Sequence, residues 1–214
     1  MDRLAADYGP PLLLSEPVRG QYVPRELWRL PGYDQMRLWQ ERGDEQPHIP
    51  LDHLLGIRME DAGFDRASFV MPASPWLVSA TGFILGGMLA TVADAALGIA
   101  AYVALPGMTA IATAELSMNF VRAATPESGV LRAHGGLIHA GGSLALSDTV
   151  VEDGAGKLLA HGTSRVVVTR PRIPQEPVVE IPWEPAARYD TPDPFERRPV
   201  VGEVVPQETW DRLG

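Results

Sequence analysis

The sequence contains no cysteine. Disulfides, thiolate zinc sites and cysteine nucleophiles are therefore all excluded. Basic residues are also scarce, since 18 Lys and Arg stand against 27 Asp and Glu, and the formal net charge is -9. Proteins that bind nucleic acid concentrate basic side chains to displace counterions from phosphate, and this sequence has no basic stripe. We therefore expect no nucleic-acid partner.

Several motifs of metal, cofactor and export chemistry are missing as well. The five histidines show no ligand spacing such as His-x-x-x-His, so no metal site is predicted. There is no Walker loop, dinucleotide fingerprint or serine-hydrolase elbow, and no resident cofactor is expected. The first ten residues lack the apolar core of a signal peptide, which makes a cytoplasmic location the expectation.

Charge is nearly absent from the middle of the chain. Between Arg66 and Glu115 the only charged side chain is Asp94, and the stretch Phe83–Leu105 is almost continuously apolar. A run of ~20 apolar residues is long enough to cross a bilayer. This run is interrupted by glycines and lacks flanking Lys or Arg anchors, and such helices also occur in protein cores covered by a sheet. We expect a covered helix and no membrane partner, with a membrane span as the alternative.

Proline divides the chain into three parts. Residues 1–50 are broken by prolines and are predicted to be an N-terminal extension, with one possible helix at Tyr33–Arg42. Residues 171–214 hold nine of the 20 prolines and are predicted to be an extended tail, because proline removes backbone donors. Residues 51–170 remain as the single domain. In the extension we expect a docking arm, in preference to a functional lid, that packs through Trp28, Met36, Leu38 and Trp39.

The domain has the pattern of an α+β fold. Two strands are predicted first, then one long helix that ends at Pro106-Gly107, then four more strands. Asp61-Ala62-Gly63 and Asp153-Gly154-Ala155-Gly156 are typical of hairpin turns. The predicted strands are His53–Glu60, Phe64–Pro72, Thr109–Ala123, Gly129–His139, Ser143–Glu152 and Lys157–Thr169, and the predicted helix is Gly86–Ala104.

Alternation along the later strands indicates an antiparallel sheet with one buried face. Leu116, Met118 and Phe120 share one face of their strand, and polar side chains share the other. In the last strand the predicted inner residues are Leu158, Ala160, Val166 and Val168. Because the helix is apolar on all sides, we expect the sheet to wrap around it.

The start of this helix carries the main candidate for chemistry. The first backbone N–H groups of a helix have no partner inside it, and glycine at Gly86 and Gly87 lets a ligand approach them closely. Asp94 follows Gly87 by seven residues, almost two turns, so both lie on one helix face. A carboxylate beside oxyanion donors can act as a general base or a nucleophile. A structural role for Asp94 is the alternative that spacing alone leaves open.

The segment Gly82–Ala96, GFILGGMLATVADAA, resembles the PaaI-like (phenylacetate-degradation type) hotdog thioesterases, which have His-Gly-Gly followed by a helical Asp at this spacing. Thr113–Ala124 is similar to the family's next strand, and Gly156–Gly162 is similar to its final hairpin. The resemblance covers about Leu54 to Val168. It implies a hotdog fold, an antiparallel sheet wrapped around one central helix.

The resemblance also implies hydrolysis of an acyl-CoA thioester at a dimer interface. Asp94 matches the carboxylate that activates water or attacks the carbonyl, and the Gly87 N–H matches the oxyanion donor beside Gly86. Thr113 matches a hydroxyl that assists the carboxylate or the water. Coenzyme A would enter only as part of the substrate, with Gly86 among the residues that bind it, and Arg122, Gly142 and Ser143 stand near positions that touch it in relatives. For Arg122 a solvated charge at the end of the strand is the alternative. The implied assembly is a homodimer or a dimer of dimers.

Two positions depart from the family pattern. Leu85 stands where the family has His, and Ser79 stands where relatives often carry an Asn that polarises the carbonyl. Ser79 or Thr81 would replace that amide only in part. The favoured interpretation is an altered thioesterase, and the alternative is a non-catalytic hotdog protein that binds an acyl-CoA or another apolar ligand. A further alternative keeps the fold and changes the reaction, to lyase or isomerase chemistry.

Overall fold

The fold is taken from a computed structural model that describes residues 27–41 and 49–170. These residues belong to one of the two compact units into which the chain divides. The helical elements are η1 (Leu27–Arg29), α2 (Gly32–Gln40), α3 (Pro50–Leu55), η3 (Pro75–Leu77), α4 (Gly86–Tyr102) and η4 (Pro126–Ser128). The strands are β1 (Arg58–Ala62), β2 (Arg66–Pro72), β3 (Ala110–Phe120), β4 (Val130–Ala140), β5 (Leu144–Glu152) and β6 (Leu158–Thr169).

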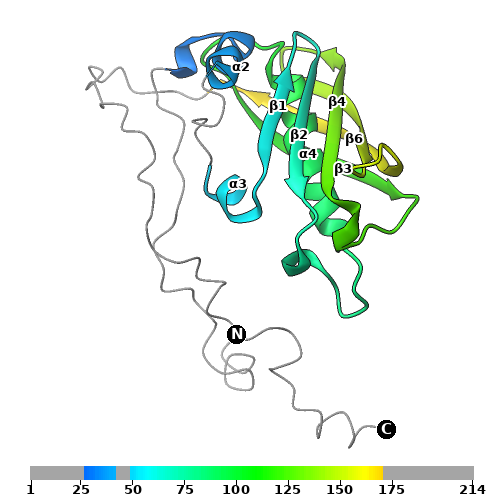
Figure 1. Cartoon of the computed structure of the whole chain (residues 1–214). Helices are drawn as coiled ribbons and strands as arrows, with labels where there is room; N and C mark the ends of the chain where they lie inside the picture. Colours follow the sequence, from blue (N-terminus) through cyan, green and yellow to red (C-terminus); the bar gives the residue numbers. More distant parts are fainter. Residues whose placement is uncertain (1–26, 42–48, 171–214) are drawn as a thin grey trace, which may run out of the picture. The chain divides into compact units, whose positions relative to one another are not determined.

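All six strands form one antiparallel sheet in the order β1-β2-β4-β5-β6-β3. The sheet curves around α4, which contacts β2, β4 and β5 along its length and β3 and β6 at the other side (Figure 1). The predicted α+β arrangement, a single apolar helix wrapped by strands, is therefore confirmed. The two edges of the sheet are β1 and β3.

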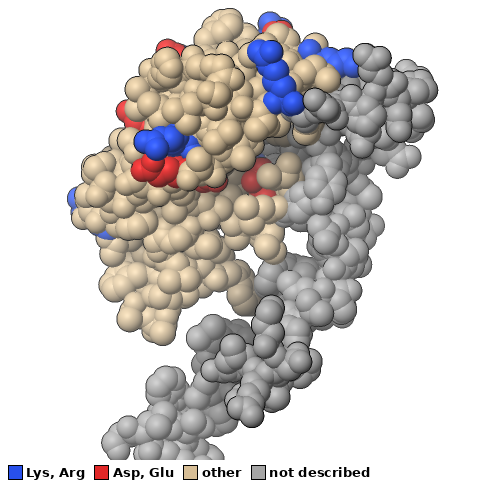
Figure 2. All heavy atoms as spheres, turned by 180° about the vertical axis from the view of Figure 1, so that it is seen from behind, with Lys and Arg blue, Asp and Glu red and all other residues tan. Residues whose placement is uncertain are grey.

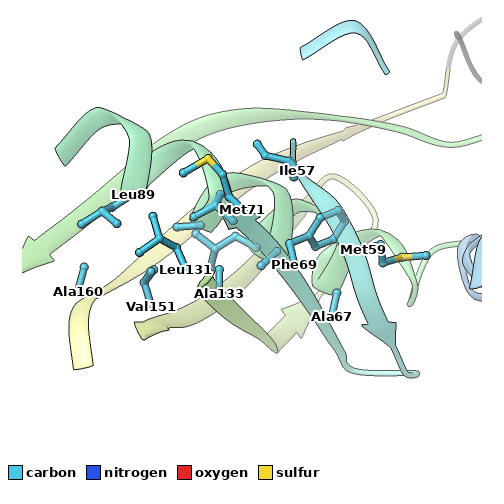
Figure 3. Packing of buried hydrophobic residues seen from close by; sticks show 14 of the residues in the cluster. Ile57, Met59, Ala67, Phe69, Met71, Leu89, Leu131, Ala133, Val151 and Ala160 are labelled. Atoms are coloured by element: carbon cyan, nitrogen blue, oxygen red, sulfur yellow. The ribbon is translucent and has the colours of Figure 1, made fainter. Parts of the chain in front are cut away.

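The core lies between α4 and the concave face of the sheet. Leu89 of α4 faces Leu131, Val151 and Ala160 of three successive strands (Figure 3). Each large apolar side chain buried there contributes roughly 1.5–3 kcal/mol. The helix approaches β4 so closely that a Cβ at Gly135 would collide with the Ala96 carbonyl, so glycine is required at that position. The sheet thus covers the side of this apolar helix on which Leu89, Val92 and Leu97 are buried, whereas Gly87 at its start is exposed.

Most predicted boundaries agree with the structure to within a few residues, and one does not. The segment predicted as the first strand, His53–Glu60, begins as the helix α3, and β1 starts only at Arg58. Pro50 occupies the first turn of α3, and Gly56 ends it in the left-handed conformation with a φ of 70°. These are ordinary helix start and stop signals. The short apolar run between them therefore forms a helix, and the prediction of a strand there was wrong.

Leu158 is a second correction. It was predicted on the buried face of the last strand, but it is exposed, and Leu159 is buried in its place. The register of β5 and β6 shifts at this point, since Val151 pairs with Ala160 and Glu152 pairs with Leu158. The extra residue in β6 is a bulge, which moves Leu158 to the other face. Val166, farther along the strand, is buried as predicted.

The described part of the N-terminal extension docks against the C-terminal end of α4. The Gly32 N–H donates to the Leu105 carbonyl (3.0 Å), and the Met108 N–H donates to the Trp28 carbonyl (2.6 Å). Gln35, which is only 1% exposed, donates from Nε2 to the Tyr102 hydroxyl (2.7 Å). These contacts support a docking arm. We call residues 27–41 the arm.

The predictions within the arm have mixed outcomes. Met36 and Trp39 are buried, as expected, and Trp28 is half-buried, but Leu38 is 38% exposed. The predicted helix corresponds to α2, although Arg42 lies outside the described residues. Residues 1–26 and 42–48 of the predicted extension and all of the predicted tail, 171–214, also lie outside the described residues. Within the described ranges, no helix is long and apolar enough to cross a membrane.

Candidate functional site

The site begins where α4 starts. Leu85 is extended, with a ψ of 135°, and the chain turns into the helix at Gly86. Among the described residues, neither the Gly86 nor the Gly87 N–H has a hydrogen-bond acceptor. A Cβ at Gly87 would meet nothing within 4 Å, so the space in front of this amide is open. Two free backbone donors at a helix N-terminus are suited to stabilising an oxyanion.

Asp94 lies two turns farther along the same helix and is half-buried. Its Oδ1 accepts a hydrogen bond of 3.0 Å from the hydroxyl of Thr113 on β3. Thr113 pairs with Val166, a buried residue of β6, which shows that its side chain points to the helix side of the sheet. The structure therefore brings together two predicted site residues that lie 19 positions apart in the sequence.

The inner face of β3 is open to solvent beside this pair. Leu116 and Phe120 pair with the inward residues Ser164 and Ala160, yet they are 37% and 50% exposed. The Phe120 ring lies against the helix start, 3.1 Å from where a Cβ at Gly86 would stand. The side chains predicted on the apolar face of this strand do point to the helix side of the sheet, but within a single chain they remain exposed to solvent. Phe120 was not predicted to be a site residue. The alternation of Leu116, Met118 and Phe120 in the sequence nevertheless placed the Phe120 side chain on the helix side of the sheet.

Ser79 lies in the loop that precedes α4, where Val78 and Ile84 form an isolated bridge. Its hydroxyl is 2.8 Å from the hydroxyl of Thr81, and its backbone N–H donates to the Phe83 carbonyl (2.7 Å). No hydrogen bond joins Ser79 to Asp94 or Gly87 among the described residues. Ser79 therefore shapes the loop in this chain, and its hydroxyl already has a local partner.

Three of the four predicted coenzyme contacts, Arg122, Gly142 and Ser143, do not lie together in one chain. Arg122 follows β3, and its Nε donates to the Leu158 carbonyl (3.3 Å), at the start of β6. Ser143, next to Gly142 in the β4–β5 turn, accepts the N–H of Val168 (3.0 Å), near the end of β6. Ten residues of strand separate those two partners, a distance of roughly 30 Å. Arg122 and Ser143 therefore lie at opposite ends of the sheet.

Leu85, at the family's histidine position, is 49% exposed and presents an apolar side chain beside the free amides. Charged side chains are sparse over much of the described surface seen in Figure 2. In the described ranges, no three His, Asp or Glu side chains gather closely enough to hold a metal ion. The chemical groups at the helix start are thus a carboxylate, a hydroxyl and backbone N–H donors in an apolar setting.

Residues 81–160 match the model of the Thioesterase superfamily. AziG from S. sahachiroi is 26% identical, and the match covers 56% of this chain and 96% of that one with a TM-score of 0.52. A thioesterase from Haemophilus influenzae is 16% identical, covering 75% and 100% with a TM-score of 0.55. The PaaI protein of the phenylacetic acid degradation operon of E. coli is 18% identical, covering 64% and 91% with a TM-score of 0.53. No curated protein matches the sequence. These similarities confirm the predicted hotdog fold, and they support the predicted thioesterase family.

Proposed function

We propose that the protein hydrolyses an acyl-CoA thioester, from the premise that its sheet and central helix form a hotdog fold like that of the thioesterases to which it is similar. The observation that carries the proposal is the position of Asp94. Its carboxylate accepts a hydrogen bond from Thr113 and follows the two free amides of Gly86 and Gly87 along α4. This is a base and an oxyanion site on one rigid element.

In the proposed reaction the thioester carbonyl oxygen lies at the Gly87 N–H. Asp94 takes a proton from a water molecule, and the water oxygen attacks the carbonyl carbon. The negative charge that develops on the carbonyl oxygen is stabilised by the helix amides. The tetrahedral intermediate then collapses, the C–S bond breaks, and the thiolate of coenzyme A takes a proton. In the alternative route the Asp94 carboxylate attacks the carbonyl carbon, the C–S bond breaks and coenzyme A leaves as the thiolate, and water then hydrolyses the resulting mixed anhydride and regenerates the Asp94 carboxylate.

The complete site, in this proposal, needs a second copy of the chain. β3 is an edge strand, and the inner side chains Leu116 and Phe120 are exposed beside Asp94. An uncovered edge is a template for pairing with another strand. If two β3 strands pair antiparallel, the start of one lies opposite the end of the other. The Gly142–Ser143 turn of one copy then approaches Arg122 of the second copy. The proposed coenzyme contacts would thus lie together in the dimer.

The test is thiol release from a panel of acyl-CoA esters by wild type and Asp94→Asn. Because the chain has no cysteine, a thiol reagent reports only the coenzyme. Loss of a general base is expected to lower kcat by about 10²–10⁴-fold. Asp52→Asn is the matched control, since it also changes a half-buried aspartate, and it should stay within twofold of wild type.

Equal rates for wild type and Asp94→Asn would remove Asp94 from the mechanism. Saturable binding of acyl-CoA without turnover would favour the second candidate, a non-catalytic hotdog protein. The observation that motivates this candidate is Leu85, which offers no donor or base at the family's histidine position. A fluorescent acyl-CoA analogue would measure binding independently of hydrolysis.

A further inference from the structure

A cavity of about 330 Å³ lies near the opposite edge of the sheet, between α3, β1, β2 and the start of β4. Its walls are mainly apolar, and they are formed by Ile57, Val70, Met71, Pro72 and Val130. Ile57 and Met71 are among the residues drawn in Figure 3. Asp94 and the helix start do not line this cavity, so it is separate from the proposed catalytic site.

One carboxyl lines this apolar space. Asp52, from the first turn of α3, is half-buried, and its carboxyl has no hydrogen bond or ion pair with another described residue. Burial raises the pKa of Asp52 from 3.8 to about 6. Burial is the cause of this shift, and the Arg58 guanidinium on the same wall forms no ion pair with Asp52. At neutral pH the Asp52 carboxyl is therefore largely ionised in this mainly apolar space, with no ion pair to another described residue.

A partly buried carboxylate without a counterion is unfavourable, and a ligand that brings a positive charge recovers part of that cost. The apolar walls favour a ligand whose remaining surface is hydrocarbon. The volume lies in the range of small-molecule sites. We propose that this cavity binds a small amine, with its ammonium group at Asp52 and its apolar body against Val70, Met71 and Val130.

The probe for this site is n-hexylamine, which is protonated at neutral pH as a lysine side chain is. Isothermal titration calorimetry of the full chain at pH 7.5 should show saturable binding. Hexan-1-ol, which has the same apolar body and no charge, should bind at least tenfold more weakly. Lowering the pH to 5 protonates most of the Asp52 carboxyl and should weaken the binding of the amine by about tenfold.

Three variants locate the site. Asp52→Asn should lose the preference for the amine over the alcohol, whereas Asp94→Asn should keep it. Val130→Trp adds bulk at a wall residue that is 45% exposed, so it should fold normally and lose binding of both ligands. Equal binding of amine and alcohol by wild type, or unchanged amine binding by Asp52→Asn, would overturn the proposal. A complete lack of saturable binding would overturn it as well.

Discussion

The two edges of the sheet are treated differently by the same chain. At β1 the arm covers the edge, with Met36 and Trp39 buried and Gln40 donating to the Asp61 carboxylate (3.1 Å). At β3 the inner side chains Leu116 and Phe120 remain exposed. The chain therefore closes one edge with its own residues and leaves the other open. The proposed catalytic groups lie at the open edge, which is where a second copy can complete them.

The largest expected effect comes from placing a charge on the open edge. Leu116→Arg should separate the proposed dimer, because a charge buried without a partner in an interface costs about 3–5 kcal/mol. Thioesterase activity should fall with the dimer, since each site needs both copies. Light scattering coupled to size exclusion measures the assembly, and thiol release measures the activity.

The closed edge supplies the control for this variant. Leu38 on α2 is 38% exposed, almost equal to the 37% of Leu116, so Leu38→Arg introduces the same charge at similar exposure. We expect this variant to keep both its assembly and its activity. If Leu116→Arg behaves like Leu38→Arg, the interface does not lie on the inner face of β3.

A substitution that leaves a cavity in the arm should lower the stability of the protein at the β1 edge without changing the proposed catalytic site. Met36 is 3% exposed, and replacing a buried Met by Ala costs about 2–5 kcal/mol. Met36→Ala should therefore lower the midpoint of urea unfolding, while kcat per folded molecule stays unchanged below the transition. A variant that loses kcat at full stability would show that the arm acts on the catalytic groups.

At the open edge, a smaller effect on activity is expected when Thr113, the hydrogen-bond partner of the Asp94 carboxylate, is replaced. Thr113→Val keeps the shape of the side chain and removes the hydrogen bond to Asp94. A hydrogen bond to a charged group contributes about 1.5–3 kcal/mol, so kcat should fall by at least tenfold with little change in KM. Thr113→Ser keeps the hydroxyl and should restore most of the rate. Equal kcat in Thr113→Val and wild type would limit Thr113 to a structural role.

The parts of the fold that sequence predicted well are those with a long or strict period. α4 is continuously apolar, and its start at Gly86 was predicted to the residue. The strands β3 to β6 alternate strictly enough to be recognised, except where a bulge changes the face, as at Leu158. A bulge depends on the neighbouring strand, which the local sequence does not contain. α3 has only six residues, too few for a helical period to appear.

The site was predictable to a similar extent and for a similar reason. Gly87 and Asp94 share one helix, so spacing alone put them on one face. The contact between Asp94 and Thr113 crosses from helix to strand, and only the family resemblance suggested it. The cavity proposed to bind an amine had no sequence signal, because its walls come from four elements whose packing no local pattern encodes.

The smallest expected effect is on stability, and it compares two half-buried aspartates, Asp52 and Asp94. In the folded protein burial raises the pKa of Asp52 from its ordinary value of 3.8 to about 6. Between these pH values the folded state binds more protons than the unfolded state, so its stability falls as the pH rises. Asp52→Asn cannot ionise, and it should raise Tm by a few degrees at pH 8 and have little effect at pH 4. Asp94→Asn removes a carboxylate that accepts a hydrogen bond and should not raise Tm at pH 8. If Asp52→Asn has the same effect on Tm at both pH values, its carboxyl is compensated in the folded protein, and the cavity has no spare charge to offer an amine.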